Sequence, residues 1–203
     1  MTAGLIVAGG RSSRFGETDK ALAKLAGRPL IAHVVSGLEG SLDQLLVSCR
    51  REQREAIELA LSEVSVPLSF VLDERELGPL GGVCDGLKAS DSEWTLVVGC
   101  DFPFVDGRVA AALSPANAVN AVIFQYPDGT IQPLCGRYRT DPACAVSQRL
   151  LSAGEYRVQQ LVSSLSTQFV PVGDSGLAPR LENINTPTAL ADAETRLLES
   201  ERS

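Results

Sequence analysis

The first half of the chain alternates short apolar runs with segments in which apolar residues recur every three or four positions. The apolar runs, which are candidate strands, lie at 3–8, 44–49, 67–72 and 94–99. The segments with helical spacing lie at 29–38, 51–62 and 80–89. This alternation is typical of βαβ units, in which crossover helices cover both faces of a parallel sheet. We therefore predict a Rossmann-like, three-layer α/β/α fold whose first four strands are buried on both faces.

The pattern loosens after Asp101, and a small antiparallel excursion is expected there. Candidate strands at 118–126 and 130–139 flank Pro127-Asp128-Gly129, and an Asp-Gly step is a strong hairpin signal. Helices are expected at about 141–152 and 158–164, a strand at 167–172, and a closing helix from Pro187. The length of 203 residues suits one domain spanning 1–203, in two halves at 1–105 and 106–203.

Composition restricts the partners and the compartment. A net charge of -7 and a pI near 4.8 argue against nucleic acid, which is gripped by an excess of Lys and Arg. No stretch approaches the roughly 18 apolar residues of a membrane span, and the opening apolar run is too short for a secretory signal. The five cysteines form no C-x-x-C pair, and their odd number would leave one unpaired, which is typical of cytosolic proteins with reduced thiols. We expect a cytoplasmic protein with no membrane partner.

The first apolar run leads directly into Gly9-Gly10, followed by Arg11, Arg14 and Lys20. Glycines let backbone N–H groups approach an anion, and arginine holds phosphate oxygens in a two-pronged geometry. The spacing matches neither G-x-G-x-x-G nor the Walker pattern. A glycine turn with solvated arginines is the alternative, but the combination favours a polyphosphate site.

Two further carboxylates follow predicted strands. Asp73 precedes a loop with Gly78, Gly81 and Gly82, where it could accept hydrogen bonds from a base or sugar at the carboxyl end of the sheet. Asp101 ends the apolar run at 94–99, and Mg²⁺ needs only one or two carboxylates when phosphate and water fill its other positions. Asp101 is therefore the candidate metal ligand, with a helix cap as the alternative role.

Weaker signals occur later in the chain. Arg157 follows Gly154, and Asn183 and Asn185 alternate along an extended stretch, where their amides would point the same way. As isolated motifs, these residues are more typical of turn and cap chemistry than of a binding site. Gln132 to Cys135 and Tyr138 belong to the same class, and His33 lies in an amphipathic helical pattern.

Four ordered motifs together resemble the molybdenum cofactor guanylyltransferases. They are VAGGRSSRFGETDK at 7–20, GPLGG at 78–82, CDFPF at 100–104 and NINTP at 183–187. The resemblance implies a nucleotidyltransferase fold. It also implies a Mg²⁺-dependent enzyme that transfers GMP from GTP to molybdopterin and releases pyrophosphate. Its substrates would be GTP and molybdopterin, with transient contacts to enzymes that make or accept the molybdenum cofactor. Residues 1–105 would be the nucleotide-binding half and 106–203 the acceptor-binding half.

The resemblance also implies roles for individual residues. The implied catalytic residues are Arg14, Lys20 and Asp101, with Asp101 holding the metal. The implied nucleotide-binding residues are Ala8, Gly9, Gly10, Lys20, Asp73, Gly78, Gly82 and Asp101. The implied acceptor-binding residues are Arg157, Asn183 and Asn185. The chain departs from the family at Phe15, at Gly82 and at Ser48 to Arg50, where relatives often carry Met, Ala-Gly and Asn.

Alternatives remain at this stage. A transferase that uses CTP on molybdopterin, or a sugar-phosphate or alditol-phosphate nucleotidyltransferase, would share the first loop. A nucleotide sensor or cofactor-carrier adaptor could keep the fold without turnover. Nucleotide competition and pyrophosphate release distinguish these functions.

Overall fold

A computed structural model describes residues 2–9, 19–75, 77–116, 118–173 and 176–200 of the chain. The strands are β1 Thr2–Val7, β2 Lys24–Leu25, β3 Arg28–Pro29, β4 Gln44–Cys49, β5 Leu68–Leu72, β6 Trp94–Gly99, β7 Ala121–Gln125, β8 Ile131–Arg139 and β9 Thr167–Pro171. The helices are α1 Leu30–Leu38, α2 Arg54–Ala60, α3 Gly78–Lys88, α4 Gly107–Ala112, α5 Thr140–Ser152, α6 Val158–Ser163 and α7 Pro187–Ser200, with short 3-10 turns at Lys20–Leu22 (η2), Glu39–Ser41 (η3), Arg51–Gln53 (η4) and Ala178–Leu181 (η6).

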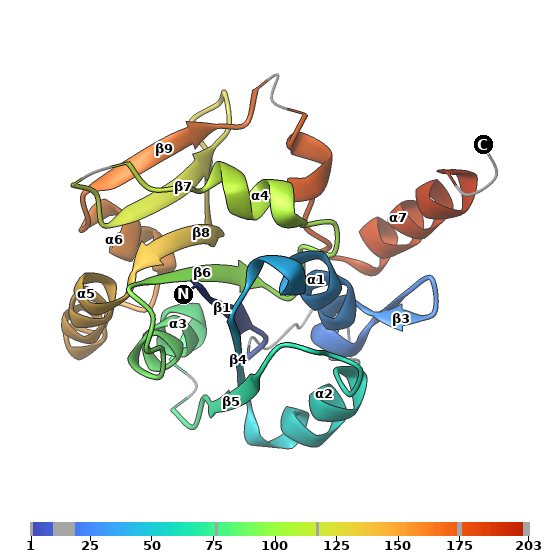
Figure 1. Ribbon diagram of the computed structural model, residues 1–203, viewed down its shortest axis with the longest axis horizontal. Coiled ribbons are helices and arrows are strands. Elements are labelled where there is room, and N and C mark those ends of the chain that lie inside the picture. Colours follow the sequence, from blue (N-terminus) through green and yellow to red (C-terminus); the bar gives the residue numbers. More distant parts are fainter. Residues whose placement is uncertain (1, 10–18, 76, 117, 174–175, 201–203) are drawn as a thin grey trace.

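Seven strands form one sheet in the order β5-β4-β1-β6-β8-β7-β9 (Figure 1). The strands β5, β4, β1 and β6 are parallel, as the βαβ pattern predicts. Strand β8 runs antiparallel to both of its neighbours, and β9 is parallel to β7. The predicted α/β fold with a small antiparallel excursion is therefore confirmed, and both halves of the chain contribute to one sheet.

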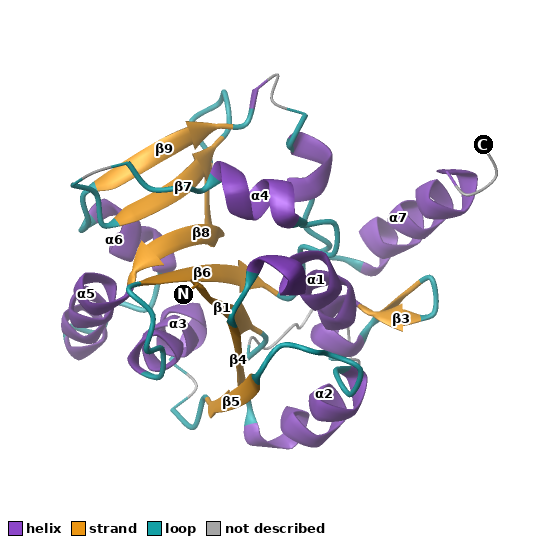
Figure 2. Ribbon diagram, in the orientation of Figure 1, coloured by secondary structure: helices purple, strands orange, loops and turns teal. Residues whose placement is uncertain are grey.

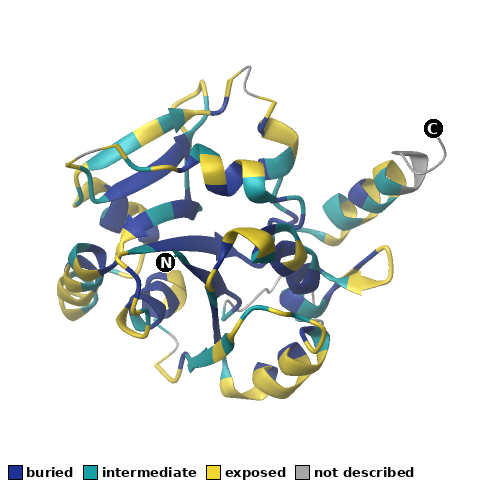
Figure 3. Ribbon diagram, viewed as in Figure 1, coloured by how far each residue is buried: buried dark blue, intermediate teal, exposed yellow. Residues whose placement is uncertain are grey.

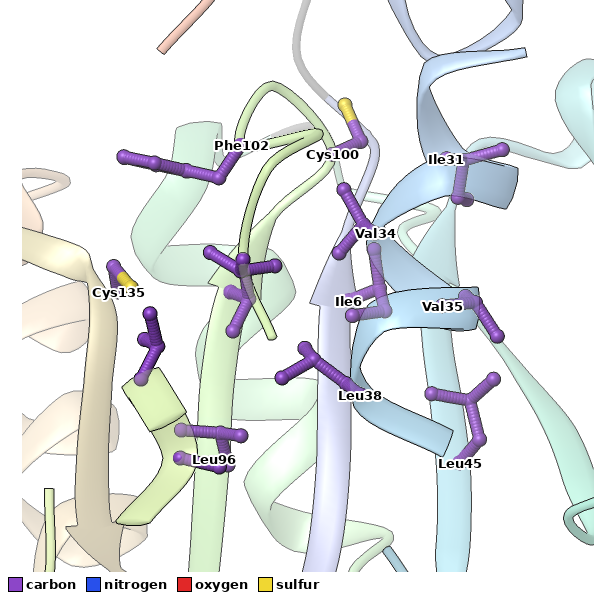
Figure 4. Close-up of a cluster of buried hydrophobic side chains, with 14 of the residues drawn as sticks. Ile6, Ile31, Val34, Val35, Leu38, Leu45, Leu96, Cys100, Phe102 and Cys135 are labelled. Carbon is purple, nitrogen blue, oxygen red and sulfur yellow. The ribbon is translucent and has the colours of Figure 1, made fainter. Parts of the chain in front are cut away.

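Helices cover both faces of the sheet (Figure 2). On one face α1, α2 and α4 pack over alternate strand residues, and Figure 4 shows Val34 and Leu38 of α1 against Ile6 of β1. On the other face α3, α5 and α6 pack over the intervening positions, which include Leu5 and Val97. The strands form the buried middle layer, while the outer faces of the helices are exposed (Figure 3). This is the three-layer arrangement that period-2 alternation within strands permits.

The predicted hairpin at Pro127-Asp128-Gly129 is confirmed. Gly129 adopts φ 86°, a left-handed conformation that costs glycine little. The backbone N–H of Tyr126 donates to the carbonyl of Thr130 over 2.8 Å, and the N–H of Thr130 donates to the Asp128 carboxylate over 2.9 Å. The turn thus brings β8 back beside β7.

Two local expectations need correction, and two elements were not predicted. Strand β5 is not buried on both faces, because it lies at the edge of the sheet and its residues are partly exposed. The helical segment expected at 51–62 begins as the 3-10 turn η4 before α2. Helix α4 was not predicted; it is only six residues long, and Asp106 caps it by accepting from the N–H groups of Arg108 and Val109. The β2–β3 hairpin also escaped notice, since its turn places Ala26 at φ 49°.

The order of the strands determines where a ligand can bind. From β1 the chain adds β4 and then β5 on one side, and β6 is then added on the other side of β1. In open α/β sheets, ligands bind at the carboxyl ends of the strands where the winding direction changes. This point lies between β1 and β6, whose carboxyl ends lead to Gly9 and Asp101.

Candidate active site

A pocket of about 110 Å³, here called the first pocket, opens at the carboxyl ends of β1, β5 and β6 and beside the start of α3. Its lining residues are Val7, Ala8, Gly9, Lys20, Asp73, Gly78, Pro79, Gly82, Gly99, Cys100, Asp101 and Leu134. All of the predicted nucleotide-binding residues that the structure describes line this pocket. Gly10 and Arg14 lie outside the described residues.

Lys20 and Asp101 form an ion pair at the edge of the first pocket. The Nζ atom of Lys20 lies 2.8 Å from Oδ2 of Asp101, and the two side chains are 13% and 16% exposed. The same Nζ donates to Oδ1 of Asn185 over 2.5 Å. Backbone pairing holds this arrangement together, because the N–H of Ile184 donates to the carbonyl of Asp101 over 2.8 Å. The cation of Lys20 and the carboxylate of Asp101, which lie near opposite ends of residues 1–105, are thus side by side.

Asp73 is buried, at 4% exposure, where β5 ends. Its backbone N–H donates to the carbonyl of Cys49 over 2.9 Å, which continues the β4–β5 ladder by one residue. Its carboxylate lies against Gly9, where a Cβ would come within 3.2 Å of Oδ2, and close to Gly81. The absence of a side chain at Gly9 therefore leaves room for the carboxylate beside the pocket.

Ala8 lines the first pocket, but its backbone polar groups already have partners. Its N–H donates to the carbonyl of Ser48 over 2.8 Å. Its carbonyl accepts from Nε2 of Gln53 over 3.1 Å. The predicted backbone contact of Ala8 with a nucleotide is consequently restricted to the second lone pair of the carbonyl and to van der Waals contact.

Helix α3 begins at the first pocket. Gly78, its first residue, adopts φ 71°, and the carbonyl of Tyr156 lies 3.7 Å from the position of a Cβ there. The first N–H groups of a helix lack intrahelical partners, and no side chain caps this end. Gly82 permits close packing as well, because a Cβ on it would lie 2.7 Å from Oγ of Ser48. The start of α3 can therefore offer N–H groups to an anion.

A second pocket of about 250 Å³ adjoins the first. Its lining residues are Pro79, Asp101, Phe102, Ile131, Gln132, Pro133, Leu134, Tyr156, Arg157, Val158, Gln159 and Asn183. Pro79, Asp101 and Leu134 line both pockets. Two of the three residues predicted to bind the acceptor substrate, Arg157 and Asn183, line this pocket together with Asp101. The third, Asn185, accepts a hydrogen bond from Lys20.

The guanidinium of Arg157 is held by a two-pronged bond to its neighbour Glu155. Nε donates to Oε1 over 2.9 Å and Nη2 to Oε2 over 3.0 Å. The Arg157 guanidinium is the main cause that lowers the pKa of Glu155 to about 2. The carboxylate is therefore ionised at neutral pH, and the Arg157 side chain, which is 68% exposed, has a defined orientation at the pocket.

Other polar groups near the site have structural roles. Burial raises the pKa of the Cys100 thiol far above its ordinary value, so Cys100 is protonated at neutral pH and is a poor nucleophile. Tyr138 is fully buried and donates to the carbonyl of Pro133 over 2.6 Å. His33 lies within hydrogen-bonding distance, 2.9 Å, of the carbonyl of Leu25 and lines neither pocket.

The residues around Asp101 fit a hard divalent cation. The carboxylate is partly exposed at the pocket edge, and Gly99 leaves room for it beneath. The amide oxygen of Asn185 is the other oxygen donor at Lys20. Among the described residues, His, Cys, Asp and Glu side chains form no group of three or more that could hold a metal. Mg²⁺ accepts a single carboxylate ligand when phosphate and water complete its shell.

Sequence reasoning missed the role of Gly99, and it named Pro79 and Leu134 only as members of longer motifs. Gly99 is the last residue of the apolar strand β6, and the sequence gave no indication that it leaves room for the carboxylate of Asp101. Pro79 and Leu134 line both pockets. Leu134 reaches the site because β8 lies beside β6, and this pairing depends on the tertiary fold.

A mainly parallel sheet covered by helices, with a glycine-lined pocket and a lysine–aspartate pair at its switch point, is the arrangement of an α/β protein of the nucleotidyltransferase class. Residues 4–168 match the MobA-like NTP transferase domain, and the chain belongs to this family.

Curated relatives carry a consistent name. The chain is 31% identical over 198 residues to a probable molybdenum cofactor guanylyltransferase of Natronomonas pharaonis, covering 96% of this chain and 97% of the relative. It is 32% identical over 189 residues to the molybdenum cofactor guanylyltransferase of Pseudomonas putida KT2440, covering 93% and 95%. The resemblance found in the sequence is thus confirmed.

Solved structures show the same fold. Molybdopterin-guanine dinucleotide biosynthesis protein A from Archaeoglobus fulgidus superposes with a TM-score of 0.78 at 24% identity, covering 98% of this chain and all of that one. A 4-diphosphocytidyl-2C-methyl-D-erythritol synthase from Anaerococcus prevotii gives a TM-score of 0.75 at 16% identity, covering 97% and 98%. In the part of the chain that the structure describes, no helix has the length and apolar character needed to cross a bilayer.

Proposed function

We propose that this protein transfers GMP from GTP to molybdopterin, with release of pyrophosphate. The observation that carries the proposal is that Asp101 borders two adjoining pockets, with Lys20 paired to it. A group-transfer enzyme must bring its two substrates together at one reacting centre. The names of the relatives supply the identities of the nucleotide and of the acceptor.

In this reaction an oxygen of the terminal phosphate of molybdopterin attacks the α-phosphorus of GTP. A new P–O bond forms, the bond from the α-phosphorus to the bridging oxygen breaks, and pyrophosphate leaves with the electron pair. The attacking oxygen is already anionic, so the chain does not need a general base. Catalysis then consists mainly of positioning and charge neutralisation.

GTP would occupy the first pocket. The carboxylate of Asp73 accepts hydrogen bonds from the base or sugar, while Gly9 and Gly82 allow the nucleotide to approach the backbone. Lys20 holds the phosphates and offsets the charge that grows on the leaving pyrophosphate. Gly10 and Arg14, which precede Lys20 in the sequence, would complete the phosphate contacts.

Asp101 would hold Mg²⁺. When bound, this ion neutralises phosphate charge and increases the electrophilic character of the α-phosphorus. Asp101 is suited to this role because it lines both pockets. The ammonium group of Lys20 offsets the negative charge of the Asp101 carboxylate. Asn185 accepts from the same ammonium group and so keeps it beside Asp101.

Molybdopterin would occupy the second pocket. Arg157, held by Glu155, presents a cation at this pocket, and Asn183 contributes an amide. These groups suit an acceptor that carries both a phosphate and a polar ring system.

The proposal is tested by incubating the protein with Mg²⁺, GTP and molybdopterin and measuring both pyrophosphate and the dinucleotide product. We expect both products in equal amounts, and competition by ATP, CTP or UTP should be weak. Preferential use of CTP would replace the guanine assignment with the cytidine one. Tight GTP binding without any pyrophosphate release would support a nucleotide sensor instead.

A further inference from the structure

Gln53 is a buried polar residue that lines neither pocket. It ends the 3-10 turn η4 behind the first pocket, and its side chain is 2% exposed. A buried amide must find partners for its N–H groups and its carbonyl, because each unpaired group costs free energy. Its partners therefore indicate what the residue is there to hold.

The side chain of Gln53 joins two points that are distant in the sequence. Its Nε2 donates to the carbonyl of Ala8, which follows β1, over 3.1 Å. The same Nε2 donates to Oδ2 of Asp19 over 2.5 Å. Its Oε1 accepts from the backbone N–H of Arg50 over 2.7 Å, which fixes the orientation of the amide.

Asp19 is held on several sides as a result. Oδ1 accepts from the N–H of Ala21 over 3.0 Å, which caps the 3-10 turn η2. Oδ2 receives the Gln53 amide and lies 3.7 Å from a guanidinium nitrogen of Arg50. The next residue along the chain is Lys20, the first of η2. The position of Asp19 therefore fixes the backbone from which Lys20 reaches Asp101.

We propose that Gln53 is a positioning residue for nucleotide binding. It links the backbone at Ala8 to the carboxylate of Asp19, and so it fixes Gly9 and Lys20 relative to each other at the first pocket. Gln53 acts through these two residues and has no contact with the substrate. The inference rests on the proposed function for its kinetic test, but the contacts on which it depends are independent of the nucleotide's identity.

Two substitutions separate the bonds of Gln53. Gln53→Met keeps the length of the side chain but removes all three hydrogen bonds. Gln53→Glu keeps the acceptor for the N–H of Arg50, and it turns the donors toward Ala8 and Asp19 into a carboxylate oxygen that repels both. The control is Glu55→Gln, which lies on the exposed side of the neighbouring helix α2.

We expect both Gln53 variants to bind GTP roughly 10- to 100-fold more weakly, as the loss of a bond to a charged group implies. The KM for GTP should rise by a similar factor, and the KM for molybdopterin should change less than about twofold, because the second pocket lies apart from Gln53. The control should match the wild type in both constants. A residue that served only global stability would not separate the two substrates.

Hydrogen exchange provides a readout that does not require turnover. The amides of Ala21, Leu22 and Ala23 are bonded within η2 or to Asp19, and they should exchange faster in both Gln53 variants. The amides of β4 and of α2 should exchange as in the wild type. Faster exchange throughout β4 and α2, with no preference for η2, would overturn the proposal.

The two hypotheses fail in different ways. A wild-type protein that releases no pyrophosphate from GTP and molybdopterin would contradict the proposed function, while the exchange experiment would still test Gln53. An active wild type whose Gln53 variants keep its KM for GTP and its exchange at η2 would contradict the positioning role alone.

Discussion

Gly99 makes room for the carboxylate of Asp101: a Cβ on residue 99 would lie 2.4 Å from Oδ1 of Asp101. Real Cβ atoms do not approach an oxygen this closely, so any side chain at 99 must displace the carboxylate of Asp101, while the ring of Phe102, 3.5 Å from the same point, is in ordinary van der Waals contact. The most buried end of β6 is therefore also part of the active-site geometry. The position of Asp101 therefore depends on the absence of a side chain at 99 as well as on the hydrogen bond that its carboxylate accepts from Lys20.

We predict that Gly99→Ala lowers turnover by about tenfold or more, because a displaced Asp101 loses its alignment with both pockets, and overpacking itself costs about 1–3 kcal/mol. Steady-state rates at several Mg²⁺ concentrations, together with Tm, measure the two effects. Gly40→Ala is the matched control, since a Cβ there meets nothing within 4 Å. Equal rates in the Gly99 variant and the wild type would show that the position of Asp101 is not critical.

We predict that Asp101→Asn reduces Mg²⁺-dependent turnover by a factor of about 100 or more, because the amide cannot supply the negative charge that the cation requires. The fold should survive, since Asn occupies the same volume. Asp128→Asn in the exposed hairpin turn removes the same charge away from the pockets and should leave the rate unchanged. The measurement is initial rate against Mg²⁺ concentration, and a full rate for Asp101→Asn would exclude the metal-binding role.

We predict that Arg157→Ala raises the KM for molybdopterin roughly tenfold to a hundredfold, because it removes a charge-assisted bond from the second pocket. The dissociation constant of GTP should remain within about twofold of the wild-type value, because Arg157 does not line the first pocket. Arg139→Ala removes a comparable exposed ion pair, with Glu93, where β8 ends beside the start of β6. An increase confined to the KM for GTP would contradict this role and would indicate that Arg157 binds the nucleotide.

The sequence allowed prediction of those parts of the site that depend on local order. Asp101 and Asp73 follow predicted strands, and parallel strands bring their carboxyl ends to one edge of the sheet. The contact of Asn185 with Lys20 was not predictable in this way. It requires residues 182–186 to cross the end of β6, where Ile184 is buried and bonded to the carbonyl of Asp101. The amide of Asn185 accepts from Lys20, and its expected role toward the acceptor stays a prediction.

The fold shows the same division between local and tertiary information. The hydrophobic run of β5 resembles that of a central strand, and only the order β5-β4-β1 shows that it lies at the edge. Gln53 lies in the charged start of the segment predicted as a helix at 51–62, and it is buried because Ala8 and Asp19 both supply partners for its amide. Such roles arise from contacts between distant segments, which periodicity does not encode.

Stability at high pH should report on the buried thiol of Cys84. Burial, with smaller contributions from Cys144 and Asp85, raises its pKa from 9.0 to about 11. The unfolded chain therefore loses this proton before the folded protein does. The thiol's contribution to stability is complete below pH 9 and is lost as the pH rises toward about 11.

Wild type should accordingly lose about 2–4 °C of Tm relative to Cys84→Ala over this interval, which corresponds to about 1 kcal/mol. Ser152→Ala, on the neighbouring helix α5, should follow the wild type at every pH. Parallel Tm curves for wild type and Cys84→Ala would show that the thiol ionises equally easily in both states.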